Sequence, residues 1–286
     1  MNLPINKKIW YYLRAFYGIS LALGDTKILG HKKTREYVKT VYNEKLYKKF
    51  LQDRSWTKIK TLEEYVSTNF FYPEIEKNTI HDVLLNGKLH SSTDFECTKI
   101  MRKLYADNLK NYLNSNAVIE LGCGTGRNLF SLRAFGFKNN MEGYDISENA
   151  IKLCRLKNDY FDSDIKFDTL DLTTELESLG TLKNKIVFSS HCLEQLKRYT
   201  DKIILDLIKL KPKRVIHFEP VPELYAFSMR DIIARIYNYA HDYQNNLLVT
   251  LKKYEKRKMI KIMDAHRLGT SMNPLNETTL INWIPA

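Results

Sequence analysis

From Ala117 to the end of the chain, short apolar runs alternate with longer stretches in which apolar residues recur every three or four positions. The short runs predict strands, and the longer stretches predict amphipathic helices. Strands that alternate with helices in this way favour a mostly parallel sheet of the α/β class. The expected strands lie at 118–121, 140–146, 164–172, 185–193 and 213–221, and the clearest helices at 128–137, 147–158 and 201–210.

The last two apolar segments differ, because no helix separates them. "KMIKIMDAHRL" (258–268) and "TTLINWIPA" (278–286) both predict strands, with the loop "GTSMNPLNE" between them. Strands joined without a crossover helix pair antiparallel. The pattern therefore predicts a seven-stranded Rossmann-like α/β sheet, mostly parallel, with an antiparallel final strand at one edge.

The first 112 residues have a helical pattern instead. Apolar residues recur at helical spacing over 5–52, and 61–113 continues mostly helical, with breaks at Pro73 and at the "LNGK" turn (85–88). No strand pattern is evident in this part. We expect residues 1–112 to form a helical N-terminal lobe that caps the ligand site and shapes the acceptor pocket of a second domain, residues 113–286.

The composition is that of a soluble globular protein, with 44% hydrophobic and 27% charged residues. No apolar stretch reaches the roughly 18 residues that a transmembrane helix requires. The cysteines, Cys97, Cys123, Cys154 and Cys192, do not have the spacing of zinc ligands. We therefore expect no metal site and no disulfides, which favours a reducing, cytoplasmic setting.

The positive charge is concentrated near the N-terminus, where residues 1–60 hold 14 Lys and Arg against 4 Asp and Glu. A solvated helical face explains this excess as well as a binding role does. The binding interpretations are attraction to a phosphorylated or nucleotide-linked substrate, to a nucleic acid or to an acidic membrane surface.

A glycine-rich turn follows the first strand, in "VIELGCGTGRN" (118–128). Gly122, Gly124 and Gly126 form a G-x-G-x-G pattern, which differs from the G-x-G-x-x-G of dinucleotide enzymes. Glu120 lies just before the turn, and a carboxylate there suits a positively charged ligand better than a pyrophosphate.

Two further acids end the next strands. Asp145 lies nineteen residues after Gly126, at the position where an acid accepts both hydroxyls of a ribose. Asp171 ends the third strand and is placed to meet the exocyclic amine of an adenine ring. Both aspartates could instead cap helices.

The stretches "VIELGCGTGRN", "GYDIS", "DTLDL" and "VFSSHCLEQL" occur in this order. Together they resemble the class I S-adenosylmethionine-dependent methyltransferases, and the resemblance covers about residues 110–286, including the final antiparallel pair. It implies S-adenosyl-L-methionine as cofactor. At the methionine portion it implies Gly122, Gly124 and Gly126 beneath the cofactor, Glu120 orienting the ammonium group through the loop or water, and Ser190 nearby. Asn128 is implied at the end of the motif. At the nucleoside portion it implies Asp145 on the ribose, Ile146 on the adenine, and Asp171 and Leu172 flanking the adenine.

Catalysis in such an enzyme requires alignment of the acceptor atom with the methyl donor, and a base where the acceptor is a hydroxyl group. His191 follows the fourth strand, and we expect it to act as a base or to orient the acceptor. Glu219, at the end of the fifth strand, is expected to point to the same catalytic rim. Glu194 is expected to be a structural acid. The tyrosine-rich segment 237–246 either lines an acceptor pocket or packs a helix.

The motif of amine and nucleobase methyltransferases, Asn or Asp followed by Pro-Pro and an aromatic residue, is absent after the fourth strand, which continues as Ser-Ser-His-Cys. This favours O-methylation of a small polar, possibly anionic acceptor such as a sugar, a nucleotide-linked sugar or a surface glycan. Two alternatives stay open. The basic N-terminal segment is compatible with an RNA methyltransferase, and the chain could bind the cofactor without transferring its methyl group.

Overall fold

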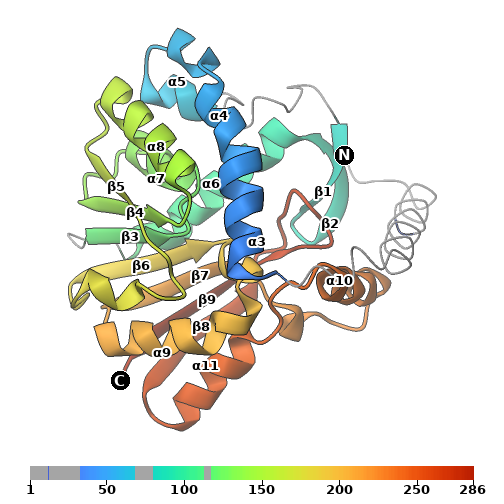
Figure 1. Ribbon diagram of the computed structural model, residues 1–286. Helices are drawn as coiled ribbons and strands as arrows, with labels where there is room; N and C mark the ends of the chain where they lie inside the picture. Colours follow the sequence, from blue (N-terminus) through green and yellow to red (C-terminus); the bar gives the residue numbers. More distant parts are fainter. Residues whose placement is uncertain (1–11, 13–32, 68–79, 113–116) are drawn as a thin grey trace.

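A seven-stranded sheet forms the centre of the protein, in a computed structural model that describes residue 12 and residues 33–67, 80–112 and 117–286 (Figure 1). The strand order is β5-β4-β3-β6-β7-β9-β8. The strands are β3 (Ala117–Leu121), β4 (Met141–Asp145), β5 (Ile165–Thr169), β6 (Lys185–Ser190), β7 (Arg214–Pro220), β8 (Ile260–Arg267) and β9 (Thr278–Pro285).

The strand directions confirm the fold class expected from the sequence. The neighbours from β5 to β7 all pair in parallel. Strand β9 is antiparallel both to β7 and to β8, which forms the edge. Each of the seven strands lies within, or within one residue of, a segment predicted as a strand.

Helices cover both faces of the sheet, because successive strand residues point to opposite sides. In β3, Val118 belongs to the core cluster on one face and Ile119 to the cluster on the other. Helices α7 and α8 lie above the sheet in Figure 1, whereas α9 and α11 lie below it. The helices on the two faces are α6 (Asp94–Lys110), α7 (Arg127–Ala134), α8 (Glu148–Phe161), α9 (Thr200–Leu210) and α11 (Leu247–Lys256).

The predicted helix starts agree with the structure in this part of the chain. The Ser147 hydroxyl accepts a hydrogen bond from the Ala150 amide and caps α8, as expected. The other helical elements here are short turns and one longer helix: η3 (Leu176–Leu179), η4 (Leu193–Gln195), η5 (Lys197–Tyr199), η6 (Pro222–Leu224) and α10 (Met229–Ala240). Among the described residues, no helix has both the length and the apolar character needed to span a bilayer.

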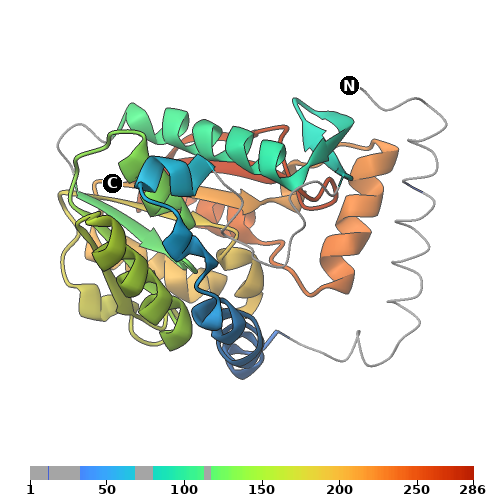
Figure 2. The ribbon, with the colours of Figure 1, turned by 90° about the horizontal axis from the view of Figure 1, so that it is seen from above.

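The N-terminal part begins with a helical segment that passes in front of the carboxyl ends of the strands (Figures 1 and 2). It consists of α3 (Arg35–Lys39), the π-helical segment η1 (Thr40–Tyr47) and α4 (Lys48–Gln52), followed by η2 (Ser55–Lys58) and α5 (Leu62–Ser67). Residues 5–32 of the predicted helical stretch, apart from Tyr12, lie outside the described residues, and so does Pro73.

The expectation that this part contains no strands is wrong. Strands β1 (Ile80–Leu85) and β2 (Lys88–Thr93) form an antiparallel hairpin. Its two-residue turn is Asn86-Gly87, and both residues have positive φ angles, of 49° and 74°. Asn-Gly is the pair that such tight hairpin turns prefer. The turn predicted at "LNGK" is therefore confirmed, but strands flank it where the pattern predicts helices.

Candidate functional site

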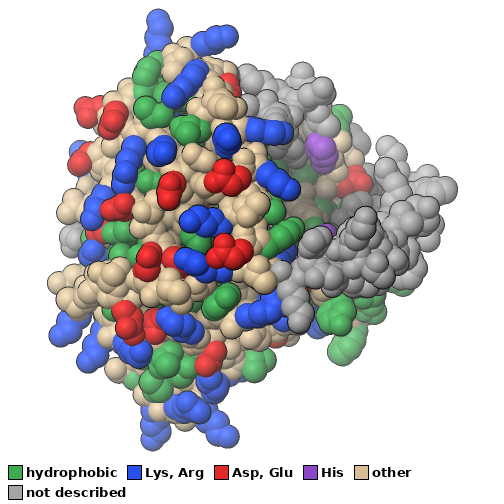
Figure 3. Space-filling view, in the orientation of Figure 1, with side chains coloured by type: hydrophobic (Ala, Val, Ile, Leu, Met, Phe, Trp, Pro, Cys, Tyr) green, Lys and Arg blue, Asp and Glu red, His purple; other side chains and the backbone are tan. Residues whose placement is uncertain are grey.

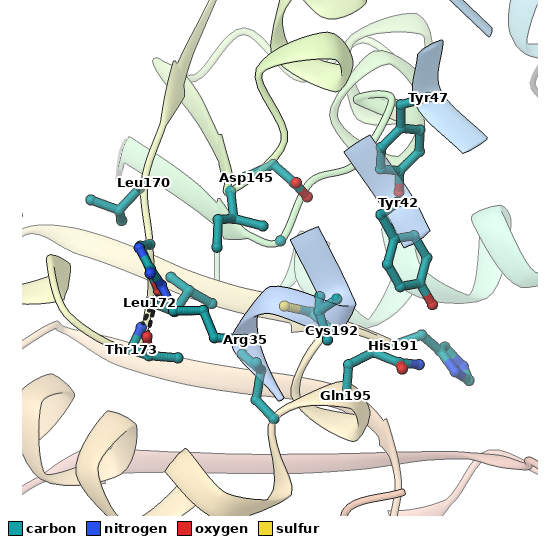
Figure 4. Close-up of a pocket in the computed structure, with 15 residues that line it drawn as sticks. Arg35, Tyr42, Tyr47, Asp145, Leu170, Leu172, Thr173, His191, Cys192 and Gln195 are labelled. Carbon is teal, nitrogen blue, oxygen red and sulfur yellow. Dashed lines mark hydrogen bonds and ion pairs between the residues drawn. The ribbon is translucent and has the colours of Figure 1, made fainter. Parts of the chain in front are cut away.

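A pocket of about 670 Å³ opens at the carboxyl ends of the parallel strands (Figure 4). It lies where the strand order of the sheet reverses, which is the place where α/β sheets bind ligands. The helical segment α3–η1 closes the pocket from the front. The lining residues are Gly122, Asp145, Ile146, Leu170, Asp171, Leu172, Thr173, His191, Cys192, Gln195 and Leu196 from the sheet side, and Arg35, Val38, Tyr42 and Tyr47 from α3–η1.

The glycine-rich turn is closely packed from both sides. All three motif glycines have positive φ angles, between 52° and 74°. A Cβ atom on Gly122 would lie 2.1 Å from Cys192 Sγ, and one on Gly124 would lie 2.8 Å from the Tyr47 hydroxyl. Gly126 ends the turn and precedes α7 as its N-cap residue. Only glycine allows the turn to approach both the segment after β6 and the helix η1 this closely.

Glu120 lies beneath this turn and is 1% exposed. Its Oε1 accepts a hydrogen bond of 2.6 Å from Asn128 Nδ2, whereas Oε2 is buried with no partner among the described residues. Burial raises the pKa of Glu120 to about 8. A positively charged group that reached Oε2 would restore the ionised form.

Asp145 and Ile146 lie side by side on the pocket wall. The Asp145 carboxylate accepts two backbone hydrogen bonds of 2.9 Å, from Gly124 to Oδ2 and from Ser147 to Oδ1. Burial raises its pKa although these hydrogen bonds oppose the shift. The side chain therefore links the end of β4 to the glycine-rich turn.

Asp171 is engaged by the protein's own groups. Its Oδ1 accepts from the Thr173 amide and hydroxyl at 2.8 and 2.6 Å, and its Oδ2 forms an ion pair with Arg35 Nε (Figure 4). Burial alone would raise the pKa of Asp171, but the hydrogen bonds from Thr173 and Arg35 outweigh it and lower the pKa. The acid expected beside the adenine is thus also the point at which α3 is attached.

A second attachment lies in the middle of the same helical segment. Asn43 is 5% exposed, and its Oδ1 accepts from the Ser147 hydroxyl at 2.8 Å and the Asn149 amide at 2.9 Å. Asn149 Nδ2 donates to the Asn43 carbonyl at 3.0 Å. These bonds hold η1 against the start of α8, and short π-helical segments are frequent at functional sites.

His191 lies on the pocket wall just after β6, with a positive φ of 51°. Its Nδ1 is 3.0 Å from Glu194 Oε2, and its Nε2 is 2.8 Å from the Thr278 hydroxyl. Burial alone would lower the pKa of His191, but the Glu194 carboxylate outweighs it and raises the pKa. Glu194 is also held by Asn276 Nδ2 at 2.8 Å, which agrees with a structural acid.

Glu219, expected at the catalytic rim, and Ser190, expected near the methionine end of the cofactor, do not line the pocket. Glu219 is 0% exposed and accepts hydrogen bonds from Ser189 and from the amides that follow His191. It cannot touch an acceptor in this position, because the segment after β6 lies between it and the pocket. Ser190 is the last residue of β6 and is not among the residues that line the pocket.

The sequence did not identify the residues that α3–η1 contributes, or Cys192 and Gln195 on the segment after β6. Tyr42 projects from η1 on the side of His191 (Figure 4), and the Tyr47 hydroxyl faces Gly124. The helical spacing of 35–52 was visible in the sequence, but no spacing rule relates a residue of this helix to a turn more than 70 residues later.

The pocket suits the cofactor that the sequence resemblance implies. Its lining combines Gly122, an acid at the end of β4, and apolar walls at Ile146 and Leu172. Of the other predicted binding residues, Glu120, Gly124, Gly126 and Asn128 do not line the pocket, and the unpartnered Glu120 oxygen is buried beneath the turn. An elongated molecule with a cationic amino-acid end and a ribosyl-adenine end matches this distribution of groups. Within the described residues, no group of three His, Cys, Asp or Glu side chains could hold a metal ion.

Comparisons with known proteins agree on one fold. A family model described as a methyltransferase domain matches residues 114–268. The magnesium protoporphyrin IX methyltransferase of Synechocystis, with S-adenosylhomocysteine bound, superposes with a TM-score of 0.51 at 17% identity, covering 67% of this chain and 85% of that one. A protein of Pyrococcus horikoshii gives a TM-score of 0.51 at 15% identity, over 68% and 93% of the two chains. Among curated proteins, none has a matching sequence.

Proposed function

Because the chain belongs to the class I S-adenosylmethionine-dependent methyltransferases, we propose that it methylates an oxygen atom of a small, polar acceptor such as a sugar, a nucleotide-linked sugar or a surface glycan. S-adenosylmethionine is the methyl donor, and its sulfonium group supplies an activated methyl group. The observation that carries the proposal is His191 on the pocket wall, with its Nδ1 3.0 Å from Glu194 Oε2.

The cofactor would be held along the ends of four strands. Gly122 and Gly124 would face its methionine portion, Glu120 would balance its ammonium group, and Asp145 would accept from its ribose. Ile146 and Leu172 would pack on the adenine, close to the Arg35–Asp171 ion pair. These assignments place the methyl group near Cys192 and His191, because these residues follow the strand next to the glycine-rich turn.

His191 is arranged to take a proton from an acceptor hydroxyl. The Glu194 carboxylate can only accept, so His191 Nδ1 carries a hydrogen and Nε2 carries the lone pair. The buried Thr278 hydroxyl donates to Nε2 at 2.8 Å, and an acceptor hydroxyl would take its place as the donor to this nitrogen. The raised pKa of His191 means that Glu194 stabilises the imidazolium formed by proton transfer.

The N-terminal part would cap this site and admit a small acceptor. Arg35, Val38, Tyr42 and Tyr47 close the pocket from the front, which leaves room for a small molecule more readily than for a folded nucleic acid. On the face in Figure 3, the described Lys and Arg side chains are interspersed with Asp and Glu. Recognition of a nucleic-acid backbone requires a continuous basic surface, so this face favours the small-molecule proposal.

The test is transfer of a labelled methyl group from S-adenosylmethionine to small-molecule and RNA fractions of a cell extract, with and without nuclease. We expect label in a small product that nuclease treatment leaves intact and that yields a methylated oxygen on analysis. Methylated nucleosides after nuclease digestion would contradict the small-molecule proposal and favour an RNA acceptor. The His191→Asn variant controls for transfer by other enzymes.

A further inference from the structure

Glu219 is buried in the sheet, yet it is the acceptor for a cluster of hydrogen-bond donors. Its Oε1 accepts from the Ser189 hydroxyl at 2.7 Å and from the amides of Cys192 and Leu193 at 3.1 Å each. Its Oε2 accepts from the Glu194 amide at 3.3 Å. Three successive backbone amides therefore converge on one carboxylate, an arrangement in which backbone N–H groups form an anion-binding concavity.

The orientation of this carboxylate is set by a chain of hydrogen bonds across β6, β7 and β9. Trp283 Nε1, which can only donate, lies 3.1 Å from His217 Nε2. His217 Nδ1 therefore carries the hydrogen and donates to Ser189 Oγ at 3.0 Å. Ser189 in turn donates to Glu219. Each donor in this series of hydrogen bonds has an acceptor, so the Glu219 carboxylate is held in one orientation.

His217 is suited to this fixed role, because it is neutral. Burial lowers its pKa to about 3, so the ring carries one hydrogen at physiological pH. Ser189, His217 and Trp283 are each 1% exposed or less. These three side chains are therefore shielded from solvent, and water does not replace the hydrogen bonds between them.

The segment held by Glu219 includes the proposed base. His191 adopts a left-handed backbone conformation, which is costly for a residue with a side chain and is kept only when its surroundings fix it. The His191 amide donates to the Phe218 carbonyl at 3.0 Å, and the next three amides bind Glu219. Both partners of the His191–Glu194 pair are thus fixed by the end of β7.

We propose that Glu219 is a positioning residue for methyl transfer: by binding the amides of residues 192–194 it sets the place of the His191 ring beside the cofactor pocket. The inference rests on the proposed role of His191. It replaces the expectation, drawn from the sequence, that Glu219 itself meets the acceptor.

The experiment follows the His191 ring by nuclear magnetic resonance in protein labelled at its histidines, with the resonance assigned from its loss in His191→Asn. In Glu219→Ala the three amides lose their acceptor, and we expect the His191 shifts to move toward those of an unstructured histidine. Glu219→Gln retains an oxygen acceptor and should keep the ring near its wild-type position. If Glu219 had only a structural role, both variants would be less stable, but their His191 chemical shifts would not differ.

The matched control is Glu223→Ala. Glu223 is a nearby glutamate that accepts the Leu248 amide at 3.0 Å and belongs to η6 instead of the His191 segment. The Glu223→Ala variant should leave the His191 resonance unchanged. If Glu219→Ala leaves His191 unmoved, or if Glu223→Ala moves it equally, the proposal is wrong.

Ser189→Ala covers the case in which Glu219→Ala does not fold. It removes only the hydroxyl that orients the carboxylate, and it should still displace the His191 resonance. An unchanged resonance in that variant would overturn the proposal. The measurement needs no acceptor, so an acceptor other than a small oxygen compound would refute the proposed function and leave this result intact.

Discussion

At the scale of single residues, the buried Glu120 makes stability depend on pH. Its pKa in the folded protein is about 8, raised by burial from an ordinary value of 4.5. Between these pH values the folded state retains a proton that the unfolded state has released. The contribution of Glu120 to stability is therefore largest below about pH 4.5 and is lost as the pH rises through 8.

We therefore expect Glu120→Gln to flatten the decline of the unfolding free energy between about pH 5 and pH 9, because Gln cannot ionise. Above pH 8 the variant should be more stable than the wild type. Urea denaturation of the cofactor-free proteins at several pH values measures this. Two curves with the same slope over this range would mean that Glu120 does not titrate as inferred.

His191 carries a second prediction at this scale. His191→Ala should retain cofactor affinity but lose turnover by about 10²–10⁴-fold, the usual contribution of a general base. Calorimetry and methyl transfer to the identified acceptor measure the two effects separately. Thr278→Val, which removes only the hydroxyl beside Nε2, should retain most activity. Undiminished turnover in His191→Ala would exclude the ring from proton transfer.

The sequence located six of the fifteen residues that line the pocket, but not the partners they use. Gly122, Asp145 and Asp171 could be placed because each follows a strand, and strand ends meet at one edge of a parallel sheet. The Arg35–Asp171 ion pair joins residues 136 positions apart, and such a contact depends on tertiary packing alone. The burial of Glu219 was missed for a related reason. The sequence indicates that Glu219 ends a strand, but not that the segment after β6 folds over it.

At the scale of elements, the hairpin β1–β2 braces the loop that leads into β9. Leu84 and Ser271 exchange two backbone hydrogen bonds of 2.9 Å, and the Gly87 amide donates to the Gly269 carbonyl at 2.8 Å. A Cβ atom on Gly269 would lie 2.8 Å from the backbone nitrogen of Gly87. The loop continues to Asn276 and Thr278, which contact Glu194 and His191.

Gly269→Ala should therefore destabilise the protein more than Gly136→Ala. Both glycines have positive φ angles, of 66° and 86°, but a Cβ atom on Gly136 would meet nothing within 4 Å. Conformational strain of about 1–2 kcal/mol applies to both variants, and the backbone clash adds to it only at Gly269. Chemical denaturation compares them. Equal losses of unfolding free energy in the two variants would show that the hairpin moves away from the new Cβ atom at little energetic cost.

Element types were predictable where the hydrophobic period was clear. The parallel strands are continuous apolar runs, since they are buried on both faces. The hairpin was missed because its strands are short and polar on one side: "KLHSST" buries only Leu89 fully. Its one distinctive signal was the Asn-Gly pair, which marks a turn without specifying what flanks it.

At the scale of the whole molecule, one pocket is built from two parts of the chain. The sheet supplies the strand ends, and α3–η1 supplies the front wall through Arg35, Tyr42 and Tyr47. The sequence suggested such a cap from the helical pattern alone. We infer that this shared pocket binds S-adenosylmethionine, with Asp145 as a main contact.

Calorimetric titration with S-adenosylmethionine and S-adenosylhomocysteine measures this binding. We expect micromolar binding to the wild type and a loss of about 1–3 kcal/mol in Asp145→Ala, the range for a charged hydrogen-bonding group. Asp168→Ala is the matched control, because Asp168 is half exposed and pairs with Arg155 outside the pocket. It should bind as the wild type does. An absence of binding to the wild type, or equal affinities for the two aspartate variants, would contradict the account.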